Sequence, residues 1–203
     1  MRTHRVRTLA LILSLLPAVV AMNAIGTPLE LQPTSKLWIA GTSTVRAFQC
    51  QAASFEAKVE SPARGAVAAV LAGQKSVDSI AVTVSADRLD CKNRTMNEHM
   101  LKALKAKDHP VIAFRVASYD LSRAAAGVDV QLTGVLALGG VEKPITVTAQ
   151  ATAGEDGALH VTGTYALRMT DYGLKPPTLM LGTMRVHNDV KVGFDIILKD
   201  RVE

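Results

Sequence analysis

Aromatic side chains are scarce in this chain: four Phe, three Tyr and one Trp make up 4 % of its 203 residues. Proteins that bind single-stranded nucleic acid by stacking need aromatic faces, so the scarcity argues against that class. The formal net charge is +5, but Arg2, Arg5 and Arg7 all precede the first apolar run. Without them 20 basic residues face 18 acidic ones, a balance too even for a nucleic-acid-binding surface.

Long hydrophobic runs are also lacking, with one exception that extends from Leu9 to Ala21. A basic segment, an apolar segment and small residues near Ala21 or Ala24 are typical of a cleaved secretory signal. About 14 apolar residues span roughly 21 Å as a helix, less than the ~30 Å hydrocarbon core, which disfavours the alternative of an uncleaved membrane anchor. We therefore expect a signal peptide at 1–24, one domain at 25–203, and a periplasmic or secreted mature protein.

Cysteine is limited to Cys50 and Cys91. Two cysteines alone are too few ligands for a structural zinc site. In an oxidising compartment an isolated pair predicts a disulfide, and two buried free thiols are the alternative.

Alternation of apolar and polar residues dominates the rest of the chain, which predicts antiparallel strands with one buried face. We expect eight strands, at 37–45, 47–59, 79–85, 111–121, 128–138, 145–152, 159–169 and 190–198. Inside the second of them the apolar residues switch from one face of the strand to the other, which predicts a bulge near Ala52. The Ala- and Gly-rich stretch 61–75 has no clear pattern. Eight strands at short spacing suit an all-β barrel or a sandwich, and closure into a barrel removes the exposed edges.

One helix is predicted between the strands, from Met96 to Lys105. Thr95 and Glu98 have the spacing of a capping box at its start, and Pro110 stops it from continuing. The helix is amphipathic, and its apolar face carries Met96, Met100, Leu101 and Leu104. An amphipathic helix beside a barrel needs a surface to cover, so we expect it to form a lid over one opening.

Catalytic motifs are missing. The sequence contains no Gly-x-Ser-x-Gly elbow, no His-Glu-x-x-His pair and no Gly-x-Gly-x-x-Gly turn. The histidines behind the apolar run are scattered, and methionines such as Met169, Met180 and Met184 are better explained as adaptable apolar fillers than as copper ligands. We expect no catalytic residues, no metal and no cofactor.

Four segments together carry a family resemblance: 35–45, 96–114, 134–144 and 169–177, the last running on to Gly182, Thr183 and Phe194. In this order they resemble the YceI-like family of exported, lipocalin-like lipid-binding proteins. The resemblance implies an eight-stranded antiparallel barrel with an internal apolar cavity and binding of a polyisoprenoid or similar long-chain amphiphile without catalysis. The chain departs from the common family pattern in its two cysteines and in Arg46-Ala47-Phe48, which replaces a His-containing segment.

The expected ligand site is the inner face of the barrel and its surroundings. Ala149, Ala151, Gly134 and Gly163 are small, which favours a hollow interior; a collapsed, filled barrel is the alternative. The predicted ligand-binding residues are Leu132, Leu136, Val147, Ala149, Ala151, Tyr165, Phe194, Met96, Met100, Leu101, Tyr172 and Leu174. Tyr172 would offer a hydroxyl to a lipid head group or a quinone oxygen, and packing in the barrel wall is its alternative.

Three functions compete at this point. The first is binding or transport of a polyisoprenoid, an isoprenoid quinone or a similar lipid, with transient contact to a membrane or membrane protein. The second is an exported interaction or stress-related module whose filled barrel is only structural. The third is an enzyme acting on a lipid, for which the sequence offers no nucleophile.

Overall fold

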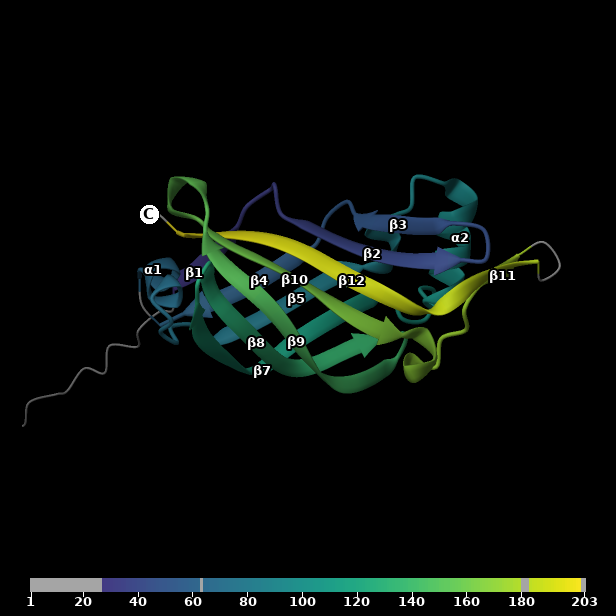
Figure 1. Cartoon of the computed structure of the whole chain (residues 1–203). Helices are drawn as coiled ribbons and strands as arrows, with labels where there is room; N and C mark the ends of the chain where they lie inside the picture. Colours follow the sequence, from purple (N-terminus) through teal and green to yellow (C-terminus); the bar gives the residue numbers. More distant parts are fainter. Residues whose placement is uncertain (1–26, 63, 180–182, 202–203) are drawn as a thin grey trace, which may run out of the picture.

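The computed structural model describes residues 27–62, 64–179 and 183–201, and the predicted signal peptide at 1–24 lies outside them. The described residues form twelve strands, two α-helices and three short 3-10 helices (Figure 1). The strands are β1 (Thr27–Leu31), β2 (Lys36–Ser43), β3 (Ala47–Ala52), β4 (Glu56–Ser61), β5 (Ser79–Ser85), β6 (Leu89–Asp90), β7 (Val111–Ala124), β8 (Gly127–Leu138), β9 (Val141–Ala153), β10 (Leu159–Arg168), β11 (Thr178–Leu179) and β12 (Met184–Asp200). The helices are α1 (Ala66–Leu71), α2 (Arg94–Ala103), η1 (Ala86–Arg88), η2 (Glu155–Gly157) and η3 (Met169–Tyr172).

Eight strands close into an antiparallel barrel in the order β1, β4, β5, β7, β8, β9, β10 and β12. Pairing between β12 and β1, with Leu198 opposite Leu31, closes the ring. The prediction of an eight-stranded antiparallel, lipocalin-like barrel is therefore confirmed.

The long strand β12 is shared between two parts of the wall. One edge pairs with β10 from Asp189 to Leu198, whereas the other edge pairs first with β2 and then with β1. From β2 the sheet continues through β3 to the short β6. The wall therefore spreads open at the end where β2 and β3 lie, and α2 lies at this end (Figure 1).

The two ends of the barrel differ in what covers them. We call one the α1 end; it holds α1, the β7–β8 turn, the β9–β10 turn and residues 199–201. We call the other the α2 end; it holds the β2–β3 turn, α2 with the turn at 104–110, the β8–β9 turn and the segment 169–177. The two helices occupy opposite ends of the barrel in Figure 1.

Helix α1 lies in the stretch that the sequence pattern leaves unassigned. Its side chains Ala66, Val67 and Val70 are buried and pack in one cluster with Val128 and Ala151 of the strands. The helix is only six residues long, too short to be stable alone, so this packing holds it in place together with a hydrogen bond from Arg123 to the Ala72 carbonyl at 2.8 Å.

Several predicted boundaries are wrong. The expected single strand 47–59 is two strands, because β3 ends at Ala52 and β4 begins only at Glu56. The two strands have different partners: β3 pairs with β2 and β6, whereas β4 pairs with β1 and β5. The switch of faces near Ala52 therefore marks a break and not a bulge. Strand β1 is absent from the prediction, and β12 begins six residues before the expected Val190.

The start of α2 also differs from the expected capping box. Asn93 is the N-cap, and its Oδ1 accepts a hydrogen bond from the Met96 N–H at 3.0 Å. Glu98 pairs with Arg94 one turn earlier at 3.1 Å and leaves the helix start to Asn93. Asn with an extended backbone is a strong N-cap, so the helix begins at Arg94, two residues before the expected Met96.

Candidate functional site

A cavity of about 560 Å³ runs through the interior of the barrel. Its lining side chains are overwhelmingly apolar and come from the barrel strands, from β2 and β3, and from α2. The size falls in the range of small-molecule and lipid pockets. The barrel is therefore hollow, and the alternative of a filled structural barrel is wrong.

The cavity is sealed at the α1 end. Val70 of α1 contributes to its lining there, together with Leu29 and Leu198, and all three are buried. Ala151, which is fully buried, also lines this end, and Val128, which is 1 % exposed, packs in the same cluster outside the lining. An apolar group that reaches this end therefore meets a mostly hydrocarbon wall.

The cavity opens at the α2 end. Three of its lining residues are exposed to solvent, Arg46, Asn93 and Thr95, and all three lie here. Half-buried His99 and Ser43 complete a polar rim on an otherwise apolar cavity. A molecule with one polar head and an apolar tail matches this arrangement when its head stays at the α2 end.

Two of the rim residues already serve the local structure. The Ser43 hydroxyl donates to the carbonyl of Arg46 at 2.9 Å and so fixes the β2–β3 turn. Asn93 caps α2 through its side-chain oxygen. Among the described residues Arg46 forms no ion pair, so its guanidinium is available to an anionic or carbonyl oxygen at the rim.

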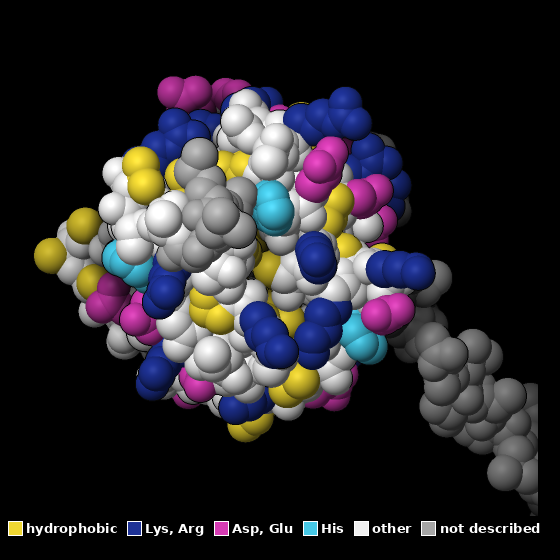
Figure 2. Space-filling view, turned by 90° about the vertical axis from the view of Figure 1, so that its right-hand side faces the viewer, with side chains coloured by type: hydrophobic (Ala, Val, Ile, Leu, Met, Phe, Trp, Pro, Cys, Tyr) yellow, Lys and Arg dark blue, Asp and Glu magenta, His cyan; other side chains and the backbone are white. Residues whose placement is uncertain are grey.

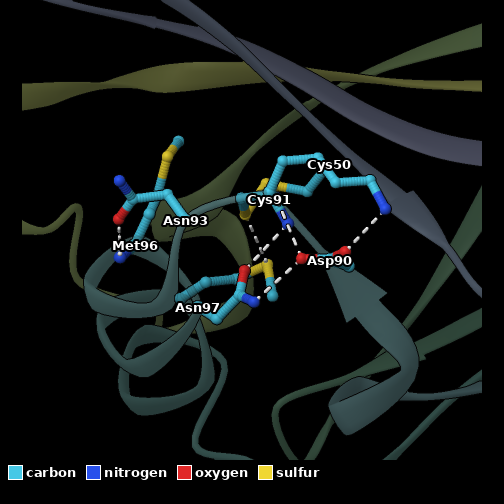
Figure 3. Close-up of a disulfide and its surroundings, with 8 residues drawn as sticks. Cys50, Asp90, Cys91, Asn93, Met96 and Asn97 are labelled. Carbon is cyan, nitrogen blue, oxygen red and sulfur yellow. Dashed lines mark hydrogen bonds and ion pairs between the residues drawn. A yellow bond between two sulfur atoms is a disulfide. The ribbon is translucent and has the colours of Figure 1, made fainter.

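A disulfide joins Cys50 of β3 to Cys91, just before α2 (Figure 3). The predicted pairing is confirmed. Both cysteines line the cavity, and the bond links the barrel wall to the start of the helix over a sequence separation of 41 residues. The helix at the rim is therefore covalently tied to the strand it faces.

Hydrogen bonds around the disulfide also stabilise the segment between β6 and α2 (Figure 3). Asn97 of α2 accepts from the Cys91 N–H at 2.8 Å, and its Nδ2 donates to Asp90 at 3.0 Å. Asp90 also accepts from the backbone N–H of Lys92 at 2.9 Å and forms an ion pair with its Nζ. The bond from Asn97, followed by those from Lys92, lowers the pKa of Asp90 from 3.8 to about 2.

The apolar face of α2 forms part of the cavity wall. Met96, Met100 and Leu104 line the cavity, and the Sδ of Met100 lies 3.6 Å from the Sγ of Cys91. Methionine side chains adapt to irregular shapes, which suits a wall that contacts a variable ligand. Helix α2 therefore forms part of the cavity wall beside the opening, and its action as a lid stays a prediction.

Nine of the twelve predicted ligand-binding residues line the cavity: Leu132, Leu136, Val147, Ala151, Tyr165, Phe194, Met96, Met100 and Leu174. Ligand binding by these nine stays a prediction. The structure places the remaining three, Ala149, Leu101 and Tyr172, off the cavity wall.

Tyr172 is packed in the wall, which is the alternative stated for it. Its ring is 2 % exposed, in a cluster with Leu174, Leu138 and Met169. Among the described residues its hydroxyl has no hydrogen-bond partner, and burial raises the pKa of Tyr172 to about 12. The expected contact with a ligand head group is wrong in this structure because the 3-10 helix η3 turns the ring into the packed wall.

Ala151 lines the cavity as expected, but the other three small residues do not. Ala149 is buried within the packed cluster near the α1 end. A side chain at Gly163 would collide with the ring of Phe194, and one at Gly134 would collide with the backbone at Arg115. The two glycines therefore permit close packing and do not create the cavity.

Sequence reasoning selected none of the five rim residues as ligand contacts, and Arg46 and His99 are the two among them with charged or titratable side chains. The helical pattern held a signal for His99, because it lies between Met96 and Met100, which share the inward face of α2. Arg46 follows a strand at a turn, and nothing in the pattern indicates that this turn lies beside the barrel opening.

Within the ranges that the structure describes, no cluster of three His, Cys, Asp or Glu side chains is placed to hold a metal ion. None of the helices in those ranges is long and apolar enough to cross a bilayer.

A family model for the YceI-like domain matches residues 37–198. In fold the chain is similar to Burkholderia cenocepacia BcnA, with a TM-score of 0.65, 16 % identity, and coverage of 83 % of this chain and 99 % of that one. A polyisoprenoid binding domain from Saccharophagus degradans gives a TM-score of 0.61 at 13 % identity, with 86 % and 98 % covered. The YceI protein of Campylobacter jejuni gives 0.53 at 18 %, with 74 % and 82 % covered. No curated protein matches the chain significantly.

Proposed function

The chain belongs to the YceI-like domain family, and we propose that it binds the apolar chain of a polyisoprenoid, an isoprenoid quinone or a similar long-chain amphiphile without catalysis. The observation that carries the proposal is the apolar cavity of about 560 Å³, sealed at the α1 end and open at the α2 end. The polyisoprenoid binding domain of Saccharophagus degradans, which is similar in fold, supports the choice of ligand class.

The energetics favour a chain-like ligand. Each methylene removed from water contributes about 0.8 kcal/mol, and the cavity wall is preformed, so little ordering offsets this gain. Side chains such as Leu132, Val147 and Phe194 offer only apolar contact. Affinity then comes from the tail, and the rim at Arg46 and His99 sets which end of the ligand faces outward.

Binding without chemistry is the simpler reading of the lining. Tyr119 lines the cavity, but its hydroxyl is already engaged, donating to the Val77 carbonyl at 3.1 Å and accepting from the Val77 N–H at 2.9 Å. Asn93 and Ser43 are held in a helix cap and a turn. Few polar groups in this lining remain free to hydrogen-bond to a ligand.

We place this activity in the periplasm or another exported location. The signal-like sequence at 1–24 supports this assignment, as does the disulfide, because disulfides persist in oxidising compartments. Pulse labelling of the full chain in its host, followed by N-terminal sequencing of the mature protein, tests it. The expected result is cleavage near Ala21 or Ala24, and an intact N-terminus in the cytoplasm contradicts it.

A matched pair of variants tests ligand binding. Val147 lines the cavity and Thr148 is exposed on the outer face of the same strand. Val147→Phe fills part of the cavity, so we expect at least a tenfold weaker affinity for a long polyprenol and an isoprenoid quinone, measured by fluorescence titration. Thr148→Phe adds the same ring outside and leaves affinity unchanged. If neither probe binds the wild-type protein, or both variants bind equally well, the proposal is wrong.

A further inference from the structure

Charge is distributed unevenly between the ends of the barrel. The α2 end, taken as 43–47, 94–110, 139–143, 169–177 and 183–187, carries eight basic residues and four acidic ones. The basic residues are Arg46, Arg94, Lys102, Lys105, Lys107, Lys143, Lys175 and Arg185. The acidic residues are Glu98, Asp108, Glu142 and Asp171.

The α1 end has the opposite balance. Its segments 27–31, 60–62, 64–79, 120–129, 153–158 and 199–201 carry eight acidic residues and five basic ones. The acidic residues are Glu30, Glu60, Asp78, Asp120, Asp129, Glu155, Asp156 and Asp200. The chain therefore presents a positive field at the end where the cavity opens and a negative field at the end where it is sealed.

The basic residues are visible as a group on the α2 end. Figure 2 looks onto this end, and dark-blue Lys and Arg side chains surround its centre with few acidic ones between them. Lys102, Lys105 and Lys107 are all exposed, and among the described residues none of them forms an ion pair. They do not line the cavity, so their charge faces outward.

Exposed apolar side chains are concentrated at the same end. Among the described residues two large hydrophobic side chains are strongly exposed, Val45 at 64 % and Val111 at 51 %. Val45 lies at the tip of the β2–β3 turn, next to Arg46 of the cavity rim. Val111 begins β7 directly after the turn that follows α2.

We propose that the α2 end docks on the surface of an anionic lipid bilayer, with the basic side chains at the lipid phosphates and Val45 in the interfacial layer. Charge complementarity selects this occupant, because anionic lipids attract clusters of basic residues and the apolar tip matches the boundary beneath them. Docking in this orientation places the cavity opening against the bilayer. Its use for exchanging ligand with the bilayer rests on the function proposed above, whereas the docking itself does not.

Sedimentation with vesicles tests the docking. The full-length mature protein is mixed with vesicles of phosphatidylcholine alone, or with 30 % phosphatidylglycerol, at low and at high salt. We expect binding to the anionic vesicles at low salt, and loss of binding on neutral vesicles or at high salt. No binding of the wild-type protein to anionic vesicles overturns the proposal.

Two triple variants locate the surface. Replacing Lys102, Lys105 and Lys107 by Gln removes three charges from the α2 end, and at about fivefold per basic residue we expect on the order of a 100-fold lower partition coefficient. The matched control replaces Lys36, Lys58 and Lys191 by Gln on the outer sides of the barrel. The control removes the same charge, so equal losses in both variants overturn the assignment to the α2 end.

A third variant tests the apolar contact. Val45→Asp places a charge at the tip of the turn, and we expect at least a tenfold weaker partition onto the anionic vesicles; unchanged partition overturns the insertion of this turn. Lipid extracted from the same protein separates the two proposals. Vesicle binding without extractable lipid supports docking and contradicts the proposed lipid binding. Extractable lipid without vesicle binding supports lipid binding and contradicts docking.

Discussion

The two ends of this barrel differ in whether they are closed and in the interactions that stabilise them. At the α1 end a short helix closes the barrel, with Ala66 and Val128 each 1 % exposed. Hydrogen bonds such as that from Arg123 to the Ala72 carbonyl at 2.8 Å add to this apolar packing. At the α2 end the wall spreads, a longer helix stands beside the opening, and a disulfide and several hydrogen bonds fix its start. Hydrogen bonds occur at both ends, so the difference lies in the helices: α1 has buried side chains, whereas α2 has none and is tied to the wall by a disulfide.

The difference follows from the small apolar surface that is buried around an opening. Residues around an opening bury little surface, so they gain little from the hydrophobic effect. No residue of α2 is buried, although the helix is ten residues long. The bond between Cys50 and Cys91 compensates for this weak packing at the point where the helix leaves the wall.

Removing the disulfide tests this contrast with the largest expected effect. The double variant Cys50→Ala and Cys91→Ala frees a loop of 41 residues, for which the chain-entropy relation gives about 4 kcal/mol at most. We expect a loss of 2–4 kcal/mol in the free energy of unfolding, about the range for native disulfides, measured by denaturant titration. Stability equal to that of the oxidised wild type would mean that packing holds α2 and that the two ends do not differ in this way.

Truncation of one side chain at each end gives the next largest effect. Val128→Ala removes two methyl groups from the packed α1 end and leaves a void, so we expect a loss of about 2 kcal/mol. Met96→Ala enlarges a cavity that already exists, so its loss is below about 1 kcal/mol. Thermal and denaturant unfolding of both variants provides the comparison, and equal losses would contradict it.

A substitution in the packed wall near the α2 end has a smaller effect of opposite sign. The buried hydroxyl of Tyr172 has no partner among the described residues. Tyr172→Phe removes it, so the free energy of unfolding stays the same or rises by about 1 kcal/mol. Ligand affinity is unchanged because Tyr172 does not line the cavity. Weaker binding of a polar-headed lipid by this variant would show that the hydroxyl reaches the ligand.

The smallest effect concerns pH. The folded-state pKa of Asp90 is lowered to about 2, below its ordinary value of 3.8. Its ionised form therefore contributes stability that is complete above about pH 4 and is lost as the pH falls towards 2. Unfolding of the wild type and of Asp90→Asn between pH 5 and 2 should show a difference that shrinks as the pH falls. Asp87→Asn, on an exposed neighbour, is the control, and a pH-independent difference for Asp90→Asn contradicts the assignment.

Much of the barrel is predictable from sequence because alternation is a local signal. Strands such as β5 and β8 carry one apolar face over their whole length, and each pairs with neighbours that do the same. Strand β1 is five residues long and includes Pro28, so its alternation is too short to detect. The short helix α1 owes its existence to contacts with distant strands, which no local pattern reveals.

The site is predictable only in part, for a related reason. The alternation of apolar residues along a strand correctly selects Leu136 and Val147 for the cavity wall. It cannot distinguish a residue that lines the cavity from one that is covered by neighbouring side chains, such as Ala149. Tyr172 lies in η3, after the end of strand β10, so the alternation along the strand does not predict which way its side chain points. Arg46 reaches the rim only because β2 and β3 spread away from the barrel axis, which is a property of the whole sheet.

Mass spectrometry of an organic extract tests the central claim most directly. The protein is purified from its native host, without detergent, and its extract is compared with that of Val147→Phe prepared in parallel. The account predicts a long-chain, apolar-tailed lipid in the wild-type extract and much less of it in the variant, at similar thermal stability. An extract without lipid, together with a sharp loss of stability in Val147→Phe, would show that the interior is not a lipid site.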